Sequence, residues 1–352
     1  MPIRTWMIYG AYGYSGRLIA ERAHAEGLAP VLSGRDADKT RVVADELGLE
    51  YRSFALDDTQ SIARNLGDID AIVHCAGPFS ATSAAMIEGC LLANTHYFDI
   101  TGEIRVFEHA HSTKIDTAAK EAGIVVCPGV GFDVVPTDCV AKTLADALPG
   151  AVQLDLGFHG NMSVSPGTAK TMVESLGDGT NARRDGKLVG IPLQVRDIDY
   201  GRGMRRSANV PWGDISTAFY TTGISNITVY WPTGDSVIQA LRFADVMRPV
   251  LGLGALQFLL KQLIDWNVQG PSQAQRDRQS VSVWGEASDA EGRTICARMT
   301  TANGYTVTQL APVAIIEHLL RHDVTAGSTT PALLMGKDFA SRLPGSSEIT
   351  VT

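Results

Sequence analysis

Short apolar runs alternate with segments of helical periodicity through the first third of the chain. The apolar runs have the length of β-strands, and the segments between them repeat apolar positions every three or four residues, as amphipathic helices do. Repeated β-α-β units of this kind predict a parallel sheet covered by helices on both faces. The predicted strands are 6–9, 30–32, 51–55, 71–75, 96–100 and 124–127, and the predicted helices are 16–26, 39–47, 82–93 and 106–122.

The pattern changes after residue 150. Longer and often alternating runs predict strands at 152–158, 216–220, 227–231, 281–286 and 294–300. Asp289-Ala290-Glu291-Gly292, between the last two, predicts a hairpin turn. These features indicate a second, α+β domain with an open antiparallel sheet, followed by a helix at 307–320.

A glycine turn joins the first predicted strand to the first predicted helix. Its spacing is G-x-x-G-x-x-G: one glycine permits a sharp turn, one lets the backbone approach a pyrophosphate, and one lets helix pack on strand. The free N–H groups and the positive dipole end of the helix then hold the phosphates. The β-α-β context favours a Rossmann-type dinucleotide site over a plain glycine-rich turn. The cofactor-binding residues predicted here are Gly10, Tyr12, Gly13, Tyr14, Ser15 and Gly16.

The second predicted strand ends in Ser33-Gly34-Arg35, at the position that selects the cofactor. A dinucleotide without a 2′-phosphate usually meets an acid here, which binds the ribose hydroxyls. A guanidinium fits a 2′-phosphate instead, so we predict NADP (NADPH), bound by Ser33, Gly34 and Arg35. Two alternatives stay open: Asp36 is the ribose acid after a small shift in alignment, or Arg35 only covers the edge of the sheet.

Two further strand ends carry candidate site residues. Ala76, Gly77, Pro78 and Phe79 follow the fourth strand, where small residues let the backbone approach the adenine-side ribose and the pyrophosphate; a simple turn is the alternative. Alternation along the fifth strand puts Tyr97, Asp99 and Thr101 on one face, with the loop to Glu103 emerging near the nicotinamide. Thr101 and Glu103 are predicted to bind substrate, although Glu103 equally suits the N-terminus of a helix. Asp133 and Asp138 suit helix caps or first-turn acids in the same way, in a helix beginning near Pro136.

The catalytic group is harder to identify. None of the nine tyrosines is followed four residues later by a lysine, which excludes the ordinary short-chain dehydrogenase mechanism. A predicted helix start at 163–171 offers N–H groups and hydroxyls to a substrate carbonyl or carboxylate, unless it is only a Ser/Pro cap. Asp99 and Lys170 are the predicted proton donors. Thr168 and Tyr220 are further predicted substrate contacts, although a tyrosine on a strand is more often part of the core.

Charge and composition narrow the possible partners. The formal net charge of −8 disfavours a nucleic-acid binder, and no stretch is long and apolar enough to span a bilayer. Five scattered cysteines give neither a disulfide framework nor a metal site, so we predict no metal and a cytoplasmic setting. A basic stretch that we predict to be rich in loops would suit an anionic or acyl-activated small molecule, unless it is only a solvated surface loop. Its residues are Arg183, Arg184, Lys187, Arg196, Arg202, Arg205 and Arg206. The apolar segment 237–268 suits core packing, a substrate pocket, a dimer face or a membrane contact.

Several of these motifs resemble those of the saccharopine dehydrogenase-like oxidoreductases, including the trans-acting enoyl reductases. The match is dense over the first 140 residues and thin through the middle. The resemblance implies a Rossmann domain at 1–140, completed by C-terminal helices at about 305–352, with an inserted mixed-sheet domain for substrate and dimerisation at 141–304. The matching segments are 10–18, Ser33-Gly34-Arg35, Ala76-Gly77-Pro78-Phe79, 97–103, 131–138, and Thr330-Pro331-Ala332 with Gly336.

The fold class is therefore α/β with an inserted α+β domain. The leading hypothesis for function is an NADPH-dependent reductase, expected to be a homo-oligomer, that transfers hydride to a conjugated C=C (enoyl) or carbonyl carbon of a partly apolar small molecule. A saccharopine-type amino-acid or imine oxidoreductase is the alternative enzyme, although no second carboxylate clamp is evident. A non-catalytic NADP-binding sensor is the alternative of another class.

Overall fold

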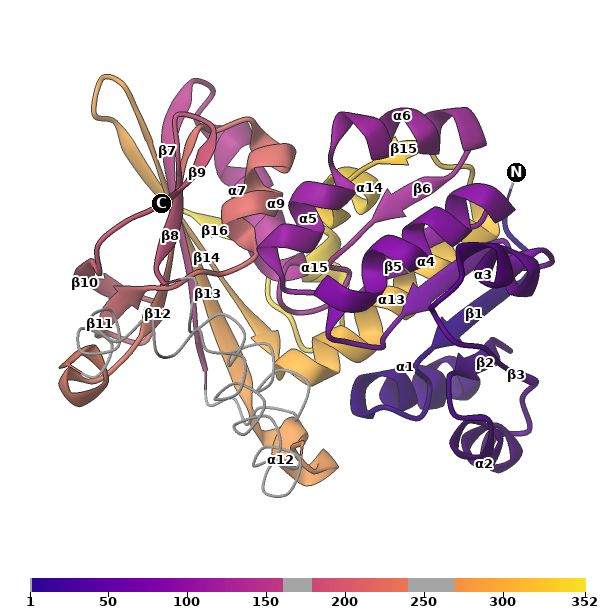
Figure 1. The fold of residues 1–352 in the computed structure, drawn as a ribbon. Coiled ribbons are helices and arrows are strands. Elements are labelled where there is room, and N and C mark those ends of the chain that lie inside the picture. The colour runs from indigo at the N-terminus through magenta and orange to yellow at the C-terminus, as the bar shows by residue number, and fades with distance from the viewer. Residues whose placement is uncertain (1, 161–178, 240–269) are drawn as a thin grey trace. The chain divides into compact units, whose positions relative to one another are not determined.

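The computed structural model describes residues 2–160, 179–239 and 270–352, which form two compact units (Figure 1). Unit 1 comprises Met1–Val135 and Gly304–Gly336, and unit 2 comprises Pro136–Asn303 and Lys337–Thr352. A parallel sheet with helices in unit 1 and a mixed sheet in unit 2 confirm the predicted fold class. The residues after Gly336 differ from the prediction, because β16 (Thr350–Val351) pairs with the sheet of unit 2 instead of completing unit 1.

The sheet of unit 1 has the strand order β15-β6-β5-β4-β1-β2-β3, and its pairings are parallel. β1 lies between β2 and β4, so the order reverses there, at the point where such sheets bind dinucleotides. All six predicted strands form. The bounds are β1 Trp6–Tyr9, β2 Val31–Gly34, β3 Tyr51–Ser53, β4 Ala71–His74, β5 His96–Asp99, β6 Val125–Cys127 and β15 Gly327–Ser328.

Helices cover both faces of this sheet, as the apolar strands require. Met7, Ile72 and Tyr97 pack in one core cluster with buried residues of α3, α4 and α6. On the other side, α1 packs on β1 and against α13. The predicted helix at 106–122 is divided, because Ser112 caps the start of α6. The bounds are α1 Tyr14–Ala25, α2 Ala37–Leu47, α3 Thr59–Leu66, α4 Phe79–Ala93, α5 Ile104–Ala110, α6 Thr113–Ala122, α13 Gly304–Arg321 and α14 Pro331–Met335.

Unit 2 is built on a mixed sheet with the order β10-β11-β12-β7-β13-β14-β16, which β8 and β9 extend beside β12. Its pairings are antiparallel apart from β12 with β7. Helix α7 packs closely on β13, since a Cβ at Gly285 would lie 2.7 Å from Val140 Cγ1. The bounds are β7 Ala151–Gly160, β8 Asn181–Arg184, β9 Lys187–Gly190, β10 Val195–Asp199, β11 Met204–Asn209, β12 Asn226–Pro232, β13 Ser280–Asp289, β14 Thr294–Ala302, α7 Val135–Ala147, α9 Asp214–Thr222, α12 Gln273–Arg278 and α15 Phe339–Arg342.

Two predictions in unit 2 are wrong. The segment 216–220 is not a strand but part of helix α9, which ends at Gly223 with a left-handed φ of 73°. The buried positions of α9 run together from Asp214 to Ala218, so the helical period is hidden in the sequence. The basic stretch, predicted as loop-rich, forms β8 to β11, whose charged side chains interrupt the apolar alternation that marks a strand.

Candidate functional site

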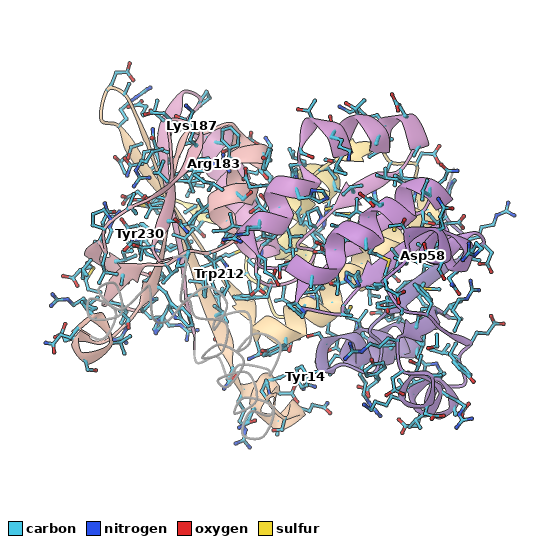
Figure 2. The ribbon with its side chains drawn as sticks, viewed as in Figure 1. Tyr14, Asp58, Arg183, Lys187, Trp212 and Tyr230 are labelled. Carbon is cyan, nitrogen blue, oxygen red and sulfur yellow. The ribbon has the colours of Figure 1, made fainter. Side chains whose placement is uncertain are left out.

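The glycine turn after β1 forms a tight cradle that leaves the start of α1 open. Gly10 has a φ of +86°, and a Cβ there would lie 2.9 Å from the backbone nitrogen of Ala76. A Cβ at Gly16 would collide with the carbonyl oxygen of Gly10. The N-cap of α1 is Gly13, whose lack of a side chain leaves the helix uncapped, and the first turn, which begins at Tyr14, has no acid (Figure 2). The positive end of the helix dipole is therefore suited to an anion such as a pyrophosphate.

The end of β2 brings a cationic and an aromatic side chain together. The ring of Tyr12 covers Gly34, where a Cβ would lie 2.6 Å from Tyr12 Cε1. Lys39 Nζ lies 5.8 Å from the centroid of the same ring. Arg35 follows Gly34 and is exposed, and no carboxylate in the described ranges forms an ion pair with it. A phosphate at this strand end would meet two basic side chains.

Asp36, the alternative ribose acid, has a structural role in this fold. It is the N-cap of α2, and its Oδ1 accepts a hydrogen bond of 3.1 Å from the backbone N–H of Lys39. Its other oxygen lies 3.2 Å from Lys39 Nζ. These hydrogen bonds to Lys39, the backbone one first, lower the pKa of Asp36. The cap favours Arg35 over Asp36 as the residue that meets the ribose substituent.

The loop that follows β4 is held by the half-buried Thr82 and the buried His74. Thr82 Oγ1 lies 2.8 Å from the carbonyl oxygen of Ala76 and 3.1 Å from that of Pro78, and it can donate to either. His74 Nε2 lies 3.0 Å from the same hydroxyl. Burial lowers the pKa of His74 to about 3, so the imidazole is neutral and can donate through Nε2. This chain of contacts fixes the predicted cofactor loop, Ala76 to Phe79.

Asp99, a predicted proton donor, is fully buried at the end of β5. Its Oδ2 accepts from the hydroxyl of Tyr97 at 2.6 Å, as the predicted shared face implies. Its Oδ1 accepts from the N–H groups of Thr101 at 3.0 Å and Gly129 at 2.9 Å. Burial raises the pKa of Asp99 to about 6, although the hydrogen bonds oppose the shift. Both oxygens are engaged, so the geometry favours a role in joining the β5 and β6 loops over proton donation.

Glu103 is the N-cap residue of α5, as the sequence allowed, but its carboxylate binds the N-terminus of α4 instead of its own helix. Its Oε1 accepts from the backbone N–H of Phe79 at 2.9 Å, and its Oε2 accepts from that of Ser80 at 2.7 Å. Its own N–H donates to Oγ1 of buried Thr101 at 3.1 Å. The two residues predicted to bind substrate from this loop therefore bind one another and α4.

Asp133, like Glu103, suits either the site or a helix N-terminus on the sequence. It precedes α7, and its Oδ2 would lie 3.2 Å from a Cβ at Gly102. Burial raises its pKa to about 6, while the residue keeps some solvent exposure, in contrast to Asp99. Asp138, by comparison, is fully buried and accepts from the hydroxyl of Thr221 inside unit 2.

The remaining predicted contacts are dispersed. Lys170 and Thr168 lie outside the described residues. Most of the apolar segment, residues 240–268, also lies outside them. Tyr220 lies on α9 in unit 2, half-buried beside Phe219, with ring centroids 5.4 Å apart. In the described ranges no three His, Cys, Asp or Glu side chains are grouped as metal ligands would be. No helix in the described part of the chain has the length and hydropathy needed to cross a bilayer.

Two of the basic side chains predicted to attract an anionic substrate are structural. Arg183 is 2% exposed and donates to the carbonyl oxygens of Ile215 and Gly186 at 2.9 and 2.7 Å (Figure 2). Arg196 bridges Asp155 at 2.7 Å and Glu286 at 2.9 Å. The basic patch predicted from the sequence therefore loses Arg183 and Arg196, because side chains already bound within the protein are unavailable to a ligand.

Curated relatives named as oxidoreductases and reductases align with part of the chain. A human protein named saccharopine dehydrogenase-like oxidoreductase is 23% identical over 203 residues, 51% of this chain and 47% of that protein. A trans-acting enoyl reductase of Mycobacterium tuberculosis is 30% identical over 143 residues, 38% of this chain and 33% of that protein. The chain thus spans less than half the length of each of these relatives. No protein-family model matches it.

A solved structure shares the fold along the whole chain. Apo saccharopine dehydrogenase (L-Glu forming) from Saccharomyces cerevisiae has a TM-score of 0.64 and 12% identity, covering 99% of both chains. The relatives carry the names of the groups that the motifs resemble, so the resemblance is confirmed. Both relatives are named as enzymes of oxidation or reduction.

Proposed function

We propose that this chain is an NADPH-dependent reductase that transfers hydride to a conjugated C=C or carbonyl carbon of a partly apolar small molecule. The observation that carries the proposal is the end of β2. There Arg35 is exposed and unpaired among the described residues, whereas Asp36 is engaged as the cap of α2. A cationic end suits a 2′-phosphate and leaves a plain ribose without its usual acid.

The residues of the glycine turn, the end of β2 and the loop after β4 fit such a cofactor. The N–H groups at the start of α1 would hold the pyrophosphate, since those of Gly10, Ala11 and Gly13 already donate to backbone carbonyl oxygens. Arg35 and Lys39 would bind the 2′-phosphate, beside the ring of Tyr12. The cofactor supplies the hydride, and the protein supplies orientation and a proton. Ala76 is within contact of Gly10, so the loop after β4 would form the other wall of the cradle.

Asp133 is our candidate for the proton. Unlike Asp99, it keeps some solvent exposure, and its raised pKa leaves a fraction of the carboxyl protonated near neutral pH. Asp99 is better suited to orient the loops. Lys170 stays a prediction from the sequence.

Enoyl reduction is the favoured chemistry within this class. The relative with 30% identity is named a trans-acting enoyl reductase. The saccharopine-type alternative needs cations to clamp two carboxylates, and the paired state of Arg183 and Arg196 removes two candidates. All five cysteines are free thiols, which supports a reducing, cytoplasmic setting. The homo-oligomer expected from the sequence stays a prediction for light scattering to check.

The first experiment is a fluorescence titration of the full chain with NADPH and, separately, NADH. Tight binding of NADPH with weak binding of NADH is expected, and it would justify a screen of enoyl and carbonyl acceptors by NADPH oxidation. Equal affinities would assign the ribose to Asp36. If neither nucleotide binds, the proposal fails. NADPH binding without turnover of any acceptor would favour the sensor.

A further inference from the structure

Helix α4 receives its N-terminal negative charge from a distant residue. Its N-cap, Pro78, has no side-chain hydrogen bond to offer, and its first turn contains no acid. Glu103, from the loop after β5, places one carboxylate oxygen on each of the first two helical N–H groups, of Phe79 and Ser80. A carboxylate is favoured here both by the helix dipole and by the charge-assisted hydrogen bonds.

The loop that precedes α4 is held in place by a second residue, Thr82. The hydroxyl of Thr82, in the first turn of α4, can donate to the carbonyl oxygen of Ala76 or to that of Pro78. Ala76 in turn lies so close to Gly10 that a Cβ on that glycine would be 2.9 Å from its nitrogen. Glu103 and Thr82 therefore hold the segment 76–79 against the glycine turn from two directions.

The strand order indicates which half of the dinucleotide this segment would meet. β2, with Arg35 at its end, lies on one side of β1, and β4 and β5 lie on the other. A dinucleotide crosses the sheet where the order reverses, so its two halves lie on opposite sides of β1. If the 2′-phosphate is at Arg35, the nicotinamide half falls over the loops after β4 and β5. The segment 76–79, predicted from the sequence to approach the adenine-side ribose, would then meet the nicotinamide half instead.

We propose that Glu103 is a positioning residue for the nicotinamide half of the cofactor. Its carboxylate holds α4 and the segment 76–79 in the conformation that receives that half, and it does not bind substrate. The proposal rests on the proposed function, since it takes NADPH as the ligand. Both carboxylate oxygens of Glu103 already accept hydrogen bonds from backbone N–H groups, so the ligand would contact the loop 76–79 and not Glu103 itself.

The test is to replace Glu103 by Gln and to compare two ligands. The amide can accept only through Oε1 and presents Nε2–H groups to the other backbone N–H, so one hydrogen bond and the charge are lost. NADPH affinity should fall about tenfold, as expected for a charge-assisted hydrogen bond that preorganises the site. Adenosine 2′,5′-bisphosphate has only the adenine half of the cofactor. The affinity of the variant for it should stay within about twofold of the wild-type value, because this ligand would bind at the end of β2, on the other side of β1 from β4.

Two matched variants complete the design. Glu88→Gln removes the same charge from an exposed position of α4 and should leave both affinities unchanged. Arg35→Ala should weaken both ligands, because both contain the 2′-phosphate. If Glu103→Gln does not fold, Thr82→Val tests the other contact that holds segment 76–79. The same selective loss of NADPH affinity is expected for that variant.

The outcomes separate this proposal from the function on which it rests. A loss confined to NADPH supports the positioning role. Equal losses for both ligands would show that Glu103 only maintains the fold. Unchanged affinities would show that its contacts with α4 do not affect ligand binding. Either result overturns the proposal. If the wild-type chain itself binds neither ligand, the proposed function fails first.

Discussion

Replacing Arg35 by Ala should weaken NADPH binding while leaving NADH binding nearly unchanged. The guanidinium lies at the end of β2, is exposed, and has no carboxylate partner in the described part of the chain. The substitution therefore breaks no internal ion pair. Because the two cofactors differ only in the 2′-phosphate, the difference between their losses isolates that contact.

The expected magnitude follows from the exposure of the group. A hydrogen bond to a charged partner contributes about 1.5–3 kcal/mol, and solvent screening places an exposed pair at the lower end. A loss of about 1.5 kcal/mol corresponds to roughly a tenfold weaker Kd. Lys39 should contribute less, because its Nζ is already 3.2 Å from Asp36.

The assay is a fluorescence titration with each cofactor at two salt concentrations. The NADPH loss in Arg35→Ala should shrink as salt rises, since ions screen an exposed pair. Arg64→Ala is the matched control, because this arginine is exposed on α3. Its ion pair with Asp58 is long, at 3.7 Å, so its removal should change little. Equal losses for NADPH and NADH would refute the assignment and make Arg35 a structural residue.

Three further substitutions test the backbone geometry of unit 1, a buried acid of the same unit and an ion pair of unit 2. Gly10→Ala should lower the free energy of unfolding by about 1–3 kcal/mol, measured by urea denaturation, because φ is +86° and the Cβ meets backbone at 2.9 Å; an unchanged midpoint would contradict the cradle geometry. The raised pKa of Asp99, about 6, means that the folded state holds a proton that the unfolded state has released, so stability falls as pH rises from about 4 to 6. Asp99→Asn, which can keep both hydrogen bonds at Oδ1, should flatten that slope with little change in turnover, and a large loss of turnover would restore Asp99 as the proton donor. Arg196→Ala should cost about 3–5 kcal/mol by leaving buried Asp155 unpaired, whereas the exposed Arg206→Ala should cost less than about 1 kcal/mol; similar thermal shifts for the two would refute the structural role of Arg196.

The sequence by itself determined the features that short stretches of chain encode. The β-α-β alternation and the glycine turn are visible because apolar period and glycine spacing act within a window of some ten residues. The same local logic placed Arg35 at a strand end and Tyr97 and Asp99 on one face, which their hydrogen bond confirms. It failed at 216–220, because a helix buried at successive positions has no polar face to mark its period.

Only the tertiary structure decided which distant groups meet. The sequence gives no sign that Glu103 would bind the start of α4, 24 residues earlier at Phe79, because that contact depends on β4 and β5 being neighbours in the sheet. The pairing of Arg196 with Asp155 and Glu286 likewise depends on strands from separate parts of the chain. Strand order is set by the packing of whole elements, which local periodicity does not encode, so side chains brought together across strands acquire their roles only in the folded chain.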